Sequence, residues 1–294
     1  MNAIRSVKLY VITEKGTKVL FGTKVQIKEI AVDTGNLKIL VYDARGDMYG
    51  MDYDYKFKYM YFTRYHHRSI MRFPYPIENP VLEKFMDTGS GPAGLAIDSE
   101  YGHVYWTEYI THRLRRCNVN GSNAVIIASN LQNPFSIRLG LVNRWMYVVE
   151  RFKRIIKARF NYSESHGIVD LNTRVDYIDL DINEEKLYWI TFHQGDLKSA
   201  SVRGCDVKTL FQTGNVDYCQ PIDVYGSSIF YSSNKKLLML NTTQGTTSTE
   251  LYTDAYMIFN IYVHHQTGKD QHKSSRQDKS KIANKATNSV KLVP

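Results

Sequence analysis

The 294-residue chain has few cysteines, and it lacks a long apolar run. Only Cys117, Cys205 and Cys219 are present, and an odd count this low excludes a disulfide framework of the kind that holds small secreted domains together. No run of apolar residues approaches the roughly 18 that a membrane-spanning helix needs. These absences favour a globular chain that is stabilised by a packed core.

Targeting signals and catalytic motifs are absent as well. The first residues, MNAIRSVKLYVITEKG, lack both the apolar centre and the small-residue cleavage site of a signal peptide. The chain contains no GxSxG, P-loop, HExxH or CxxC motif. We found no matched Glu, Asn and Asp set for a propeller-type metal hydrolase, and we therefore expect no enzyme, no metal site and no cofactor.

The net charge of +9 is concentrated at one end of the chain. From Lys269 onward there are seven Lys or Arg residues against Asp270 and Asp278, a local charge of +5, which leaves about +4 for the remainder. The remainder shows no basic stripe with the spacing that phosphate groups require. Nucleic acid is therefore not expected as a partner.

A repeat of about 42 residues runs along most of the sequence. The aromatic residues Tyr61, Tyr105, Tyr147, Tyr188 and Phe230 follow one another at steps of 44, 42, 41 and 42, and one further step back reaches Leu20. Four short strands per repeat of this length are typical of a β-propeller. We predict an all-β fold of six four-stranded antiparallel blades.

The unit at 92–131 carries a family resemblance. Its segments GLAID, VYWTE and NVNGSN resemble the YWTD repeat, or class B repeat, of the low-density lipoprotein receptor-related family, and LDINEEKLYWIT resembles it next best. The resemblance covers about residues 18–266 and implies that the motif positions hold the sheets together. These positions are Tyr61, Tyr105, Trp106, Thr107, Tyr147, Tyr188, Trp189 and Phe230.

Three regions follow from this register: an N-terminal extension (1–17), the propeller (18–266) and a disordered, basic polar tail (267–294). The tail has too few apolar residues to offset the entropy of ordering. Residues 18–43 are expected to form strands two, three and four of a blade whose first strand is missing. Residues 257–265 are expected to form a single strand that no further strands of a blade follow. The resemblance implies that these two segments complete the sixth blade, which closes the ring.

The family resemblance implies that acidic and hydroxyl residues of the repeat connect neighbouring blades. Asp52, Asp98 and Asp181 are each expected at the end of the first strand of their own blade. Blade three lacks the motif threonine and blade five has Ser232-Ser233, so those contacts should be looser or repacked. The register also separates Cys205 and Cys219 by about 20 Å along one strand, too far for a disulfide, so we expect free, half-buried thiols.

Three glycosylation sequons begin at Asn120, Asn161 and Asn241. All follow the repeat aromatic by 11 to 15 residues, in the expected hairpin between strands three and four. Glycans there would cover one face and leave the opposite face free.

The opposite face, built from loops between blades and loops after strand two, is the predicted binding surface. In the family, this face of some propellers captures short segments of protein ligands. By register, the candidate ligand-binding residues are Asp47, Tyr65, His66, Ala93, Ile110, Phe135, Arg151, Arg174, Asp176, Phe192, His193, Tyr218 and Tyr256. The set is rich in aromatics, as interface hot spots are, although ordinary loop residues around a narrow pore are an alternative.

His66 and His193 occupy the same repeat position, and histidine titrates near endosomal pH. The resemblance implies a device for ligand release at low pH, and solvated loop histidines are the alternative. Both interpretations are open at this point.

The sequence therefore predicts a non-enzymatic, extracellular protein-binding module of an endocytic or Wnt-co-receptor-like receptor. Neighbouring epidermal-growth-factor-like or cysteine-rich modules are the implied partners in a longer protein, of which we interpret this chain as a fragment. A nidogen-like matrix module is the nearest alternative, followed by a propeller hydrolase or lactonase and by a fragment without function.

Overall fold

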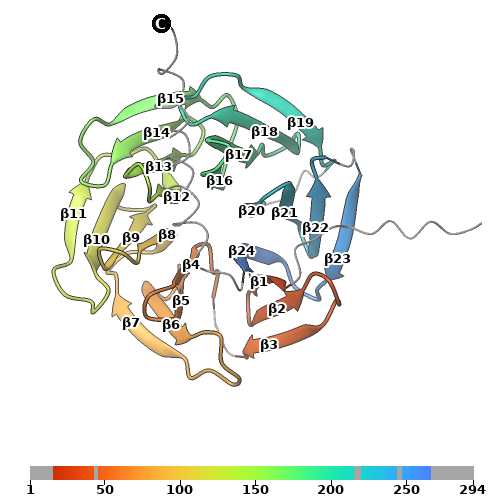
Figure 1. The fold of residues 1–294 in the computed structure, drawn as a ribbon. Coiled ribbons are helices and arrows are strands. Elements are labelled where there is room, and N and C mark those ends of the chain that lie inside the picture. Colours follow the sequence, from red (N-terminus) through yellow and green to blue (C-terminus); the bar gives the residue numbers. More distant parts are fainter. Residues whose placement is uncertain (1–15, 43–45, 215–219, 244–246, 266–294) are drawn as a thin grey trace, which may run out of the picture.

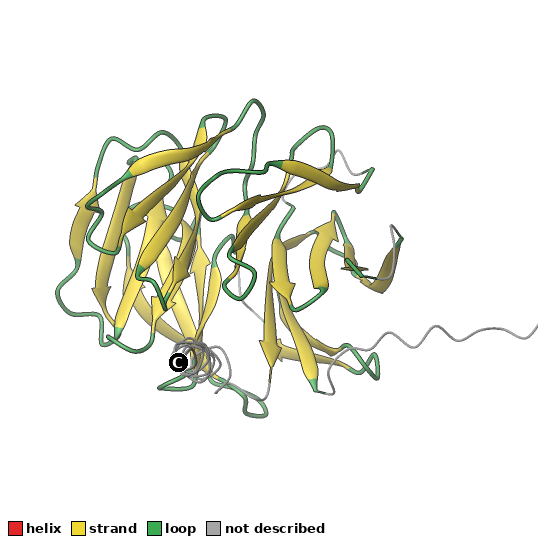
Figure 2. Ribbon diagram, turned by 45° about the horizontal axis from the view of Figure 1, so that its top comes forward, coloured by secondary structure: helices red, strands yellow, loops and turns green. Residues whose placement is uncertain are grey.

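The computed structural model describes residues 16–42, 46–214, 220–243 and 247–265. These residues form six four-stranded antiparallel sheets around a central axis (Figure 1). The described elements are all strands joined by turns and loops (Figure 2). The six-bladed all-β prediction is confirmed.

Five blades are continuous in sequence, each running outward from the axis. Blade one contains β4 (Met51–Asp54), β5 (Tyr59–Arg64), β6 (Ser69–Pro74) and β7 (Glu83–Asp87). Blade two contains β8 (Pro92–Asp98), β9 (His103–Glu108), β10 (Arg113–Asn118) and β11 (Val125–Ala128). Blade three contains β12 (Pro134–Gly140), β13 (Trp145–Glu150), β14 (Arg154–Arg159) and β15 (His166–Asp170).

Blade four contains β16 (Ile178–Asp181), β17 (Lys186–Ile190), β18 (Asp196–Ser201) and β19 (Lys208–Gln212). Blade five contains β20 (Ile222–Tyr225), β21 (Ser228–Ser233), β22 (Lys236–Asn241) and β23 (Ser248–Thr253). The predicted regions 1–17 and 267–294 lie almost entirely outside the described residues, as does Tyr218.

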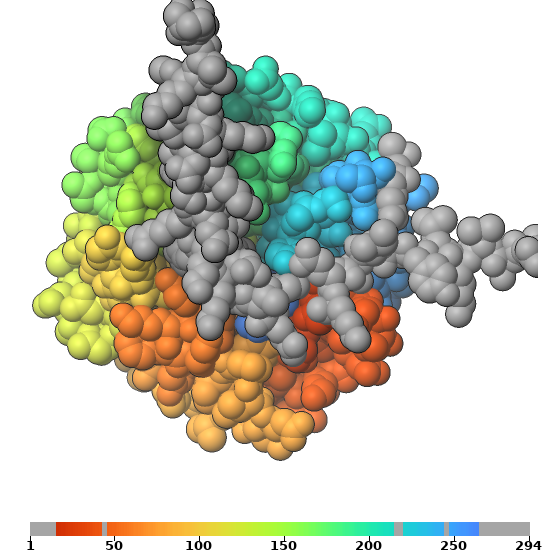
Figure 3. Space-filling model, viewed as in Figure 1, coloured from red at the N-terminus to blue at the C-terminus, as the bar shows by residue number. Residues whose placement is uncertain are grey.

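Blade six is split between the two ends of the described chain, as predicted. Its order is β24 (Ile258–His265), β1 (Thr17–Thr23), β2 (Ile27–Ala31) and β3 (Leu37–Val41). Antiparallel pairing of β1 with β24 places Val19 opposite Val263. This pairing covers the inner edge of β1, and the space-filling view shows the first and last coloured segments in contact (Figure 3).

Blades pack face to face, which explains why their middle strands are apolar on both sides. Trp106 in β9 is fully buried in a cluster with Tyr61 and Ile70 of blade one. Burial of such a side chain contributes about 2–3 kcal/mol. Gly94 is required where blades two and three meet, because a Cβ there would lie 2.3 Å from the carbonyl oxygen of Phe135.

The motif threonine connects adjacent blades. Thr107 Oγ1 accepts a hydrogen bond from the Gly94 backbone N–H (2.8 Å) and donates one to the Phe135 carbonyl in blade three. Thr63 makes the equivalent pair in blade one. Blade three has Val149 at this position, and there Ser136 Oγ instead accepts from the Ile178 N–H of blade four (3.1 Å). The contact between blades three and four is therefore repacked around Ser136, which is one of the two outcomes, looser or repacked, that we predicted.

The register corrects our grouping of Asp52 with Asp98 and Asp181. Strand pairing shows that Asp54 is the equivalent of those two residues, since Asp52 lies opposite the repeat aromatic Tyr61. Asp54 and Asp181 each accept hydrogen bonds from two backbone N–H groups of the following turn, so they cap hairpins. Asp52 has a different place, in the central channel.

Candidate functional site

Two sets of loops share one face of the disc, which we call the top face. They are the turns between the second and third strand of each blade and the loops that join one blade to the next. The hairpins between strands one and two and between strands three and four lie on the opposite, bottom face. Antiparallel connectivity dictates this division, because each successive turn reverses the chain.

Aromatic rings pack at the centre of the top face. Phe135 has its ring centroid 5.1 Å from that of Tyr49 and 5.5 Å from that of Tyr177. Tyr49 also packs against Tyr65 (5.4 Å) and Phe259 (5.8 Å). Because edge-to-face packing fixes each ring, the rings form a rigid base beneath the surrounding loops.

Two arginines and one carboxylate lie beside this base. Asp176, with only 6% of its side chain exposed, is bound by Arg174 through two hydrogen bonds of 2.6 and 2.7 Å, and Arg151 Nε lies 2.5 Å from its Oδ1. The Arg151 guanidinium also stacks 3.5 Å from the Phe135 ring centroid. The cluster carries a net positive charge, because two guanidinium groups share one carboxylate.

The two histidines of the repeat position are exposed and have different neighbours. His66 Nε2 lies 3.0 Å from Asp47 Oδ2, and its ring packs against Tyr65 (5.1 Å). The ring of His193 packs against Phe192 at 4.1 Å, in a turn where His193 has a φ of 68°.

The predicted top-face residues lie at different depths. Ile110 (59% exposed), Tyr256 (48%), His66 and His193 are open to solvent. Asp47, Tyr65, Arg151, Arg174 and Phe192 are half-buried. Ala93, Phe135 and Asp176 are buried and support the face from below.

Phe152 was missed by the sequence reasoning. It is 58% exposed at the tip of the turn at 151–153, in the repeat position that His66, Ile110 and His193 also occupy. Five residues after each repeat aromatic, the chain reaches the outermost point of this turn. That spacing, applied to blade three, would have found it.

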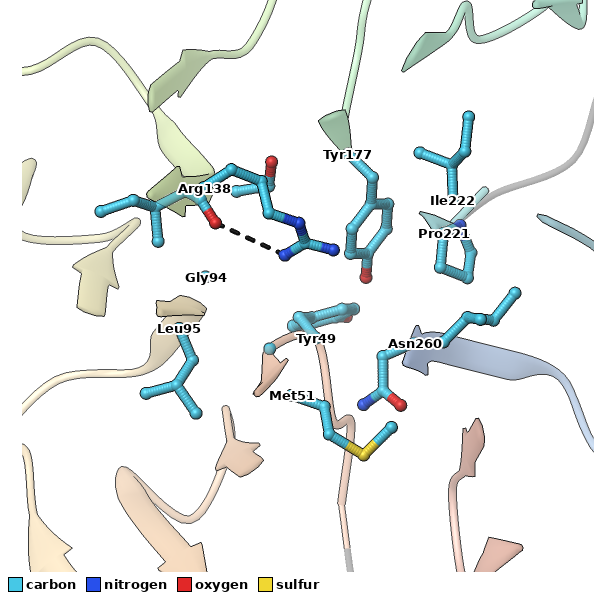
Figure 4. Close-up of a pocket in the computed structure, with 13 residues that line it drawn as sticks. Tyr49, Met51, Gly94, Leu95, Arg138, Tyr177, Pro221, Ile222 and Asn260 are labelled. Carbon is cyan, nitrogen blue, oxygen red and sulfur yellow. Dashed lines mark hydrogen bonds between the residues drawn. The ribbon is translucent and has the colours of Figure 1, made fainter. Parts of the chain in front are cut away.

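The central channel is narrow below the aromatic base. Residues from four different blades line it: Figure 4 shows the Arg138 guanidinium directed toward Tyr177 and the Tyr177 hydroxyl toward Tyr49. The Asn260 amide is turned away from them and binds the Gly22 N–H and the Met48 carbonyl. The cavity in this channel measures about 10 Å³. That is room for about one water molecule and too little for a substrate.

Three carboxylates occupy matched positions on the first strands around this channel. Asp52, Asp179 and Asp223 each lie opposite the repeat aromatic of their blade. Each accepts a hydrogen bond from a backbone N–H in the first strand of the next blade, at 2.7, 2.6 and 3.0 Å. Arg138, in blade three, binds Asp179 at 2.6 Å.

The channel charges act on one another. Burial, followed by the Asp179 carboxylate, raises the pKa of Asp223 well above its ordinary value. Burial raises the pKa of Asp52 to about 6, against the opposing effect of Arg138. Among the described residues, no group of three or more His, Cys, Asp or Glu side chains could hold a metal ion. The hydrogen bonds therefore assign these carboxylates a structural role between blades.

The three sequons lie on the bottom face, as predicted, with one difference in exposure. Asn120 and Asn161 are exposed, whereas Asn241 is the last residue of β22 and is buried. In all three, the hydroxyl of the third sequon residue donates a 2.7 Å hydrogen bond to the asparagine Oδ1.

The cysteine environments differ from the predicted half-buried state. Cys117 is a fully buried free thiol and Cys205 is an exposed one, while Cys219 lies outside the described residues. Within the part of the chain that the structure describes, no helix is long and apolar enough to cross a membrane.

Comparisons with known proteins agree with this architecture. The family model described as low-density lipoprotein receptor repeat class B matches residues 102–138, from the first hairpin of blade two to the first strand of blade three. A solved structure, the crystal structure of a nidogen/laminin complex, matches with a TM-score of 0.74 and 16% sequence identity. The match covers 84% of this chain and 98% of that chain. The chain is therefore a six-bladed β-propeller that contains a low-density lipoprotein receptor class B repeat, which confirms the predicted resemblance.

Proposed function

We propose that this propeller is a non-enzymatic, extracellular protein-binding module that engages its partner with the top face. The observation that carries the proposal is the rigid base of packed aromatic rings at the centre of the top face. Exposed apolar side chains, among them Ile110, Phe152 and Tyr256, lie on the loops of the same face. Exposed apolar residues on a pre-organised surface favour protein recognition, because little order has to be created on binding.

The bottom face is proposed to carry the glycans. Asn120 and Asn161 are exposed there, and glycans at these positions would leave the top face open. We expect a secreted form of the chain to lose mass on treatment with a glycosidase. No loss of mass from secreted protein would remove this part of the proposal.

Two biological settings fit such a module. The class B repeat favours a lipoprotein-receptor-like cell-surface protein, active in endocytosis or in Wnt-type signalling. The similarity to a nidogen/laminin complex favours a matrix-type role as the second candidate. In both settings we propose that the top face binds the partner, so one experiment addresses them together.

The test is capture of cell-surface and matrix proteins by the full chain and by two triple variants. In the top variant, Ile110, Phe152 and Tyr256 become serine. In the matched control, Phe57, Tyr101 and Val207 become serine, since these are equally exposed apolar residues on the bottom face. We expect a captured protein to be lost with the top variant and kept with the control. Loss with the control alone would overturn the proposal.

A further inference from the structure

The two faces of the disc differ in charge. The described residues of the top-face loops contain six cationic and three acidic side chains, a formal charge of +3 with histidine neutral. The cationic residues are Lys24, Arg68, Arg151, Lys153, Arg174 and Lys235. The described residues of the bottom-face loops contain four cationic and seven acidic side chains, a formal charge of −3.

The acidic residues of the top face are already paired. Asp176 binds Arg151 and Arg174, and Asp47 lies beside His66. Asp254 has a fully buried side chain and pairs with Lys28 of β2 at 2.5 Å. Two of the three negative charges, those of Asp176 and Asp254, are thus neutralised by cationic side chains, so they oppose an anionic ligand only weakly.

The cations of the turn tips, in contrast, face solvent. Lys24, Arg68 and Lys235 are exposed and Lys153 is half-buried, and none of the four forms an ion pair with another described residue. They come from four different blades, so together they surround the aromatic base. The described loops of this face carry a formal charge of +3, and an excess of positive charge attracts an anionic partner and disfavours a cationic one.

We propose that the top face recognises an acidic segment of a protein partner that also carries an apolar anchor residue. This inference rests on the proposed function and adds the chemistry of the partner. The charges select aspartate and glutamate, and the exposed Ile110 and Phe152 provide an apolar surface between the cations. A sulfated polysaccharide would satisfy the charges but leave these side chains uncovered, so a peptide fits better.

The test uses a random 12-residue peptide library displayed on phage and selected against the full chain. Each selected peptide is then tested for binding to a charge-reversed variant that carries Arg68→Glu, Lys153→Glu and Lys235→Glu. The matched control reverses three bottom-face cations, Lys56→Glu, Lys58→Glu and Arg203→Glu.

We expect the selected peptides to be enriched in Asp and Glu around one aromatic or aliphatic residue. Their affinity should fall at least tenfold in the charge-reversed variant and when the salt concentration is raised from 50 to 200 mM. The control should stay within twofold of the parent. Peptides without an acidic bias, retained binding in the charge-reversed variant, or displacement by heparin in preference to every peptide would each overturn the inference.

The design separates this inference from the proposed function. If a partner depends on Ile110, Phe152 and Tyr256 but not on the three cations, the binding face stands and its acidic preference fails. If binding depends on neither set, both fail.

Discussion

Replacing Asp52 by asparagine is expected to change how the stability of the propeller depends on pH. Asp52 Oδ2 accepts a 2.7 Å hydrogen bond from the Ile97 N–H of blade two, and Oδ1 accepts one from the Tyr53 N–H (2.8 Å). Burial in the central channel raises the pKa of this carboxyl from 3.8 to about 6, although Arg138 acts in the opposite direction. The folded protein therefore holds the Asp52 proton more tightly than the unfolded chain does.

The sign and size of the effect follow from proton linkage. The contribution of Asp52 to the unfolding free energy is fully present below pH 3.8 and is lost as the pH rises through 6. Above that pH, the folded state must hold a buried charge. At about 1.4 kcal/mol per pKa unit, the raised pKa corresponds to about 3 kcal/mol. The side chain is half-buried, so screening by solvent lowers our expectation to about 2 kcal/mol.

The assay is urea unfolding of the parent and the Asp52→Asn variant at pH 4 and pH 7.5. Between these values, the difference in unfolding free energy should move by about 2 kcal/mol in favour of the variant. Loss of one acceptor oxygen in the variant should change the unfolding free energy by the same amount at pH 4 and at pH 7.5. Asp206→Asn, on an exposed hairpin, is the control for removing one charge. A difference between variant and parent that does not change with pH would refute the reasoning.

Three further predictions concern single positions. Thr107→Val removes a blade-to-blade hydrogen bond and leaves the Phe135 carbonyl unsatisfied, so urea unfolding should show a loss of about 1–3 kcal/mol, and an unchanged midpoint would contradict this role. Gly94→Ala places a Cβ against the same carbonyl and should lower the melting temperature by several degrees or prevent folding, whereas parental stability would contradict the close approach. Burial raises the pKa of Cys117 to about 12, so iodoacetamide at pH 8 should label exposed Cys205 rapidly and Cys117 only after unfolding, as peptide mass spectrometry would show.

The blade architecture was predictable because its cause repeats. Every middle strand is buried on both faces, so each blade needs an aromatic such as Tyr105 or Tyr188 at the same point, and the spacing gives the blade count directly. The split sixth blade followed from the same register, since Leu20 and its partner strand at 257–265 occupy the missing places.

The candidate site was less predictable, because depth and pairing depend on distant residues. Phe135 resembles an exposed loop aromatic in sequence, yet the rings of Tyr49, Tyr109 and Tyr177 from three other blades bury it. Asp52 and Asp54 are two residues apart on the same strand, and only the pairing with β5 assigns Asp52 to the channel and Asp54 to the hairpin. No local sequence pattern distinguishes the two aspartates. Phe152, by contrast, was within reach of the repeat spacing.

The pH dependence of ligand binding distinguishes an acidic partner from a ligand that the histidines release at low pH. The proposed acidic partner is held by arginine and lysine side chains, so its binding should persist from pH 7.4 to pH 5.5. Release at low pH, which the family resemblance suggested, is the opposite result. Binding at both pH values by the parent and by the His66→Ala, His193→Ala variant distinguishes them.

Hydrogen exchange of the full chain, with and without the tightest peptide from the library, tests whether the top face is the binding face. We predict that the peptide slows amide exchange in the top-face turns at 65–68, 109–112 and 151–153, since binding there excludes water from those amides. Slowed exchange confined to the bottom-face hairpins, such as those at 55–58 and 99–102, would contradict it.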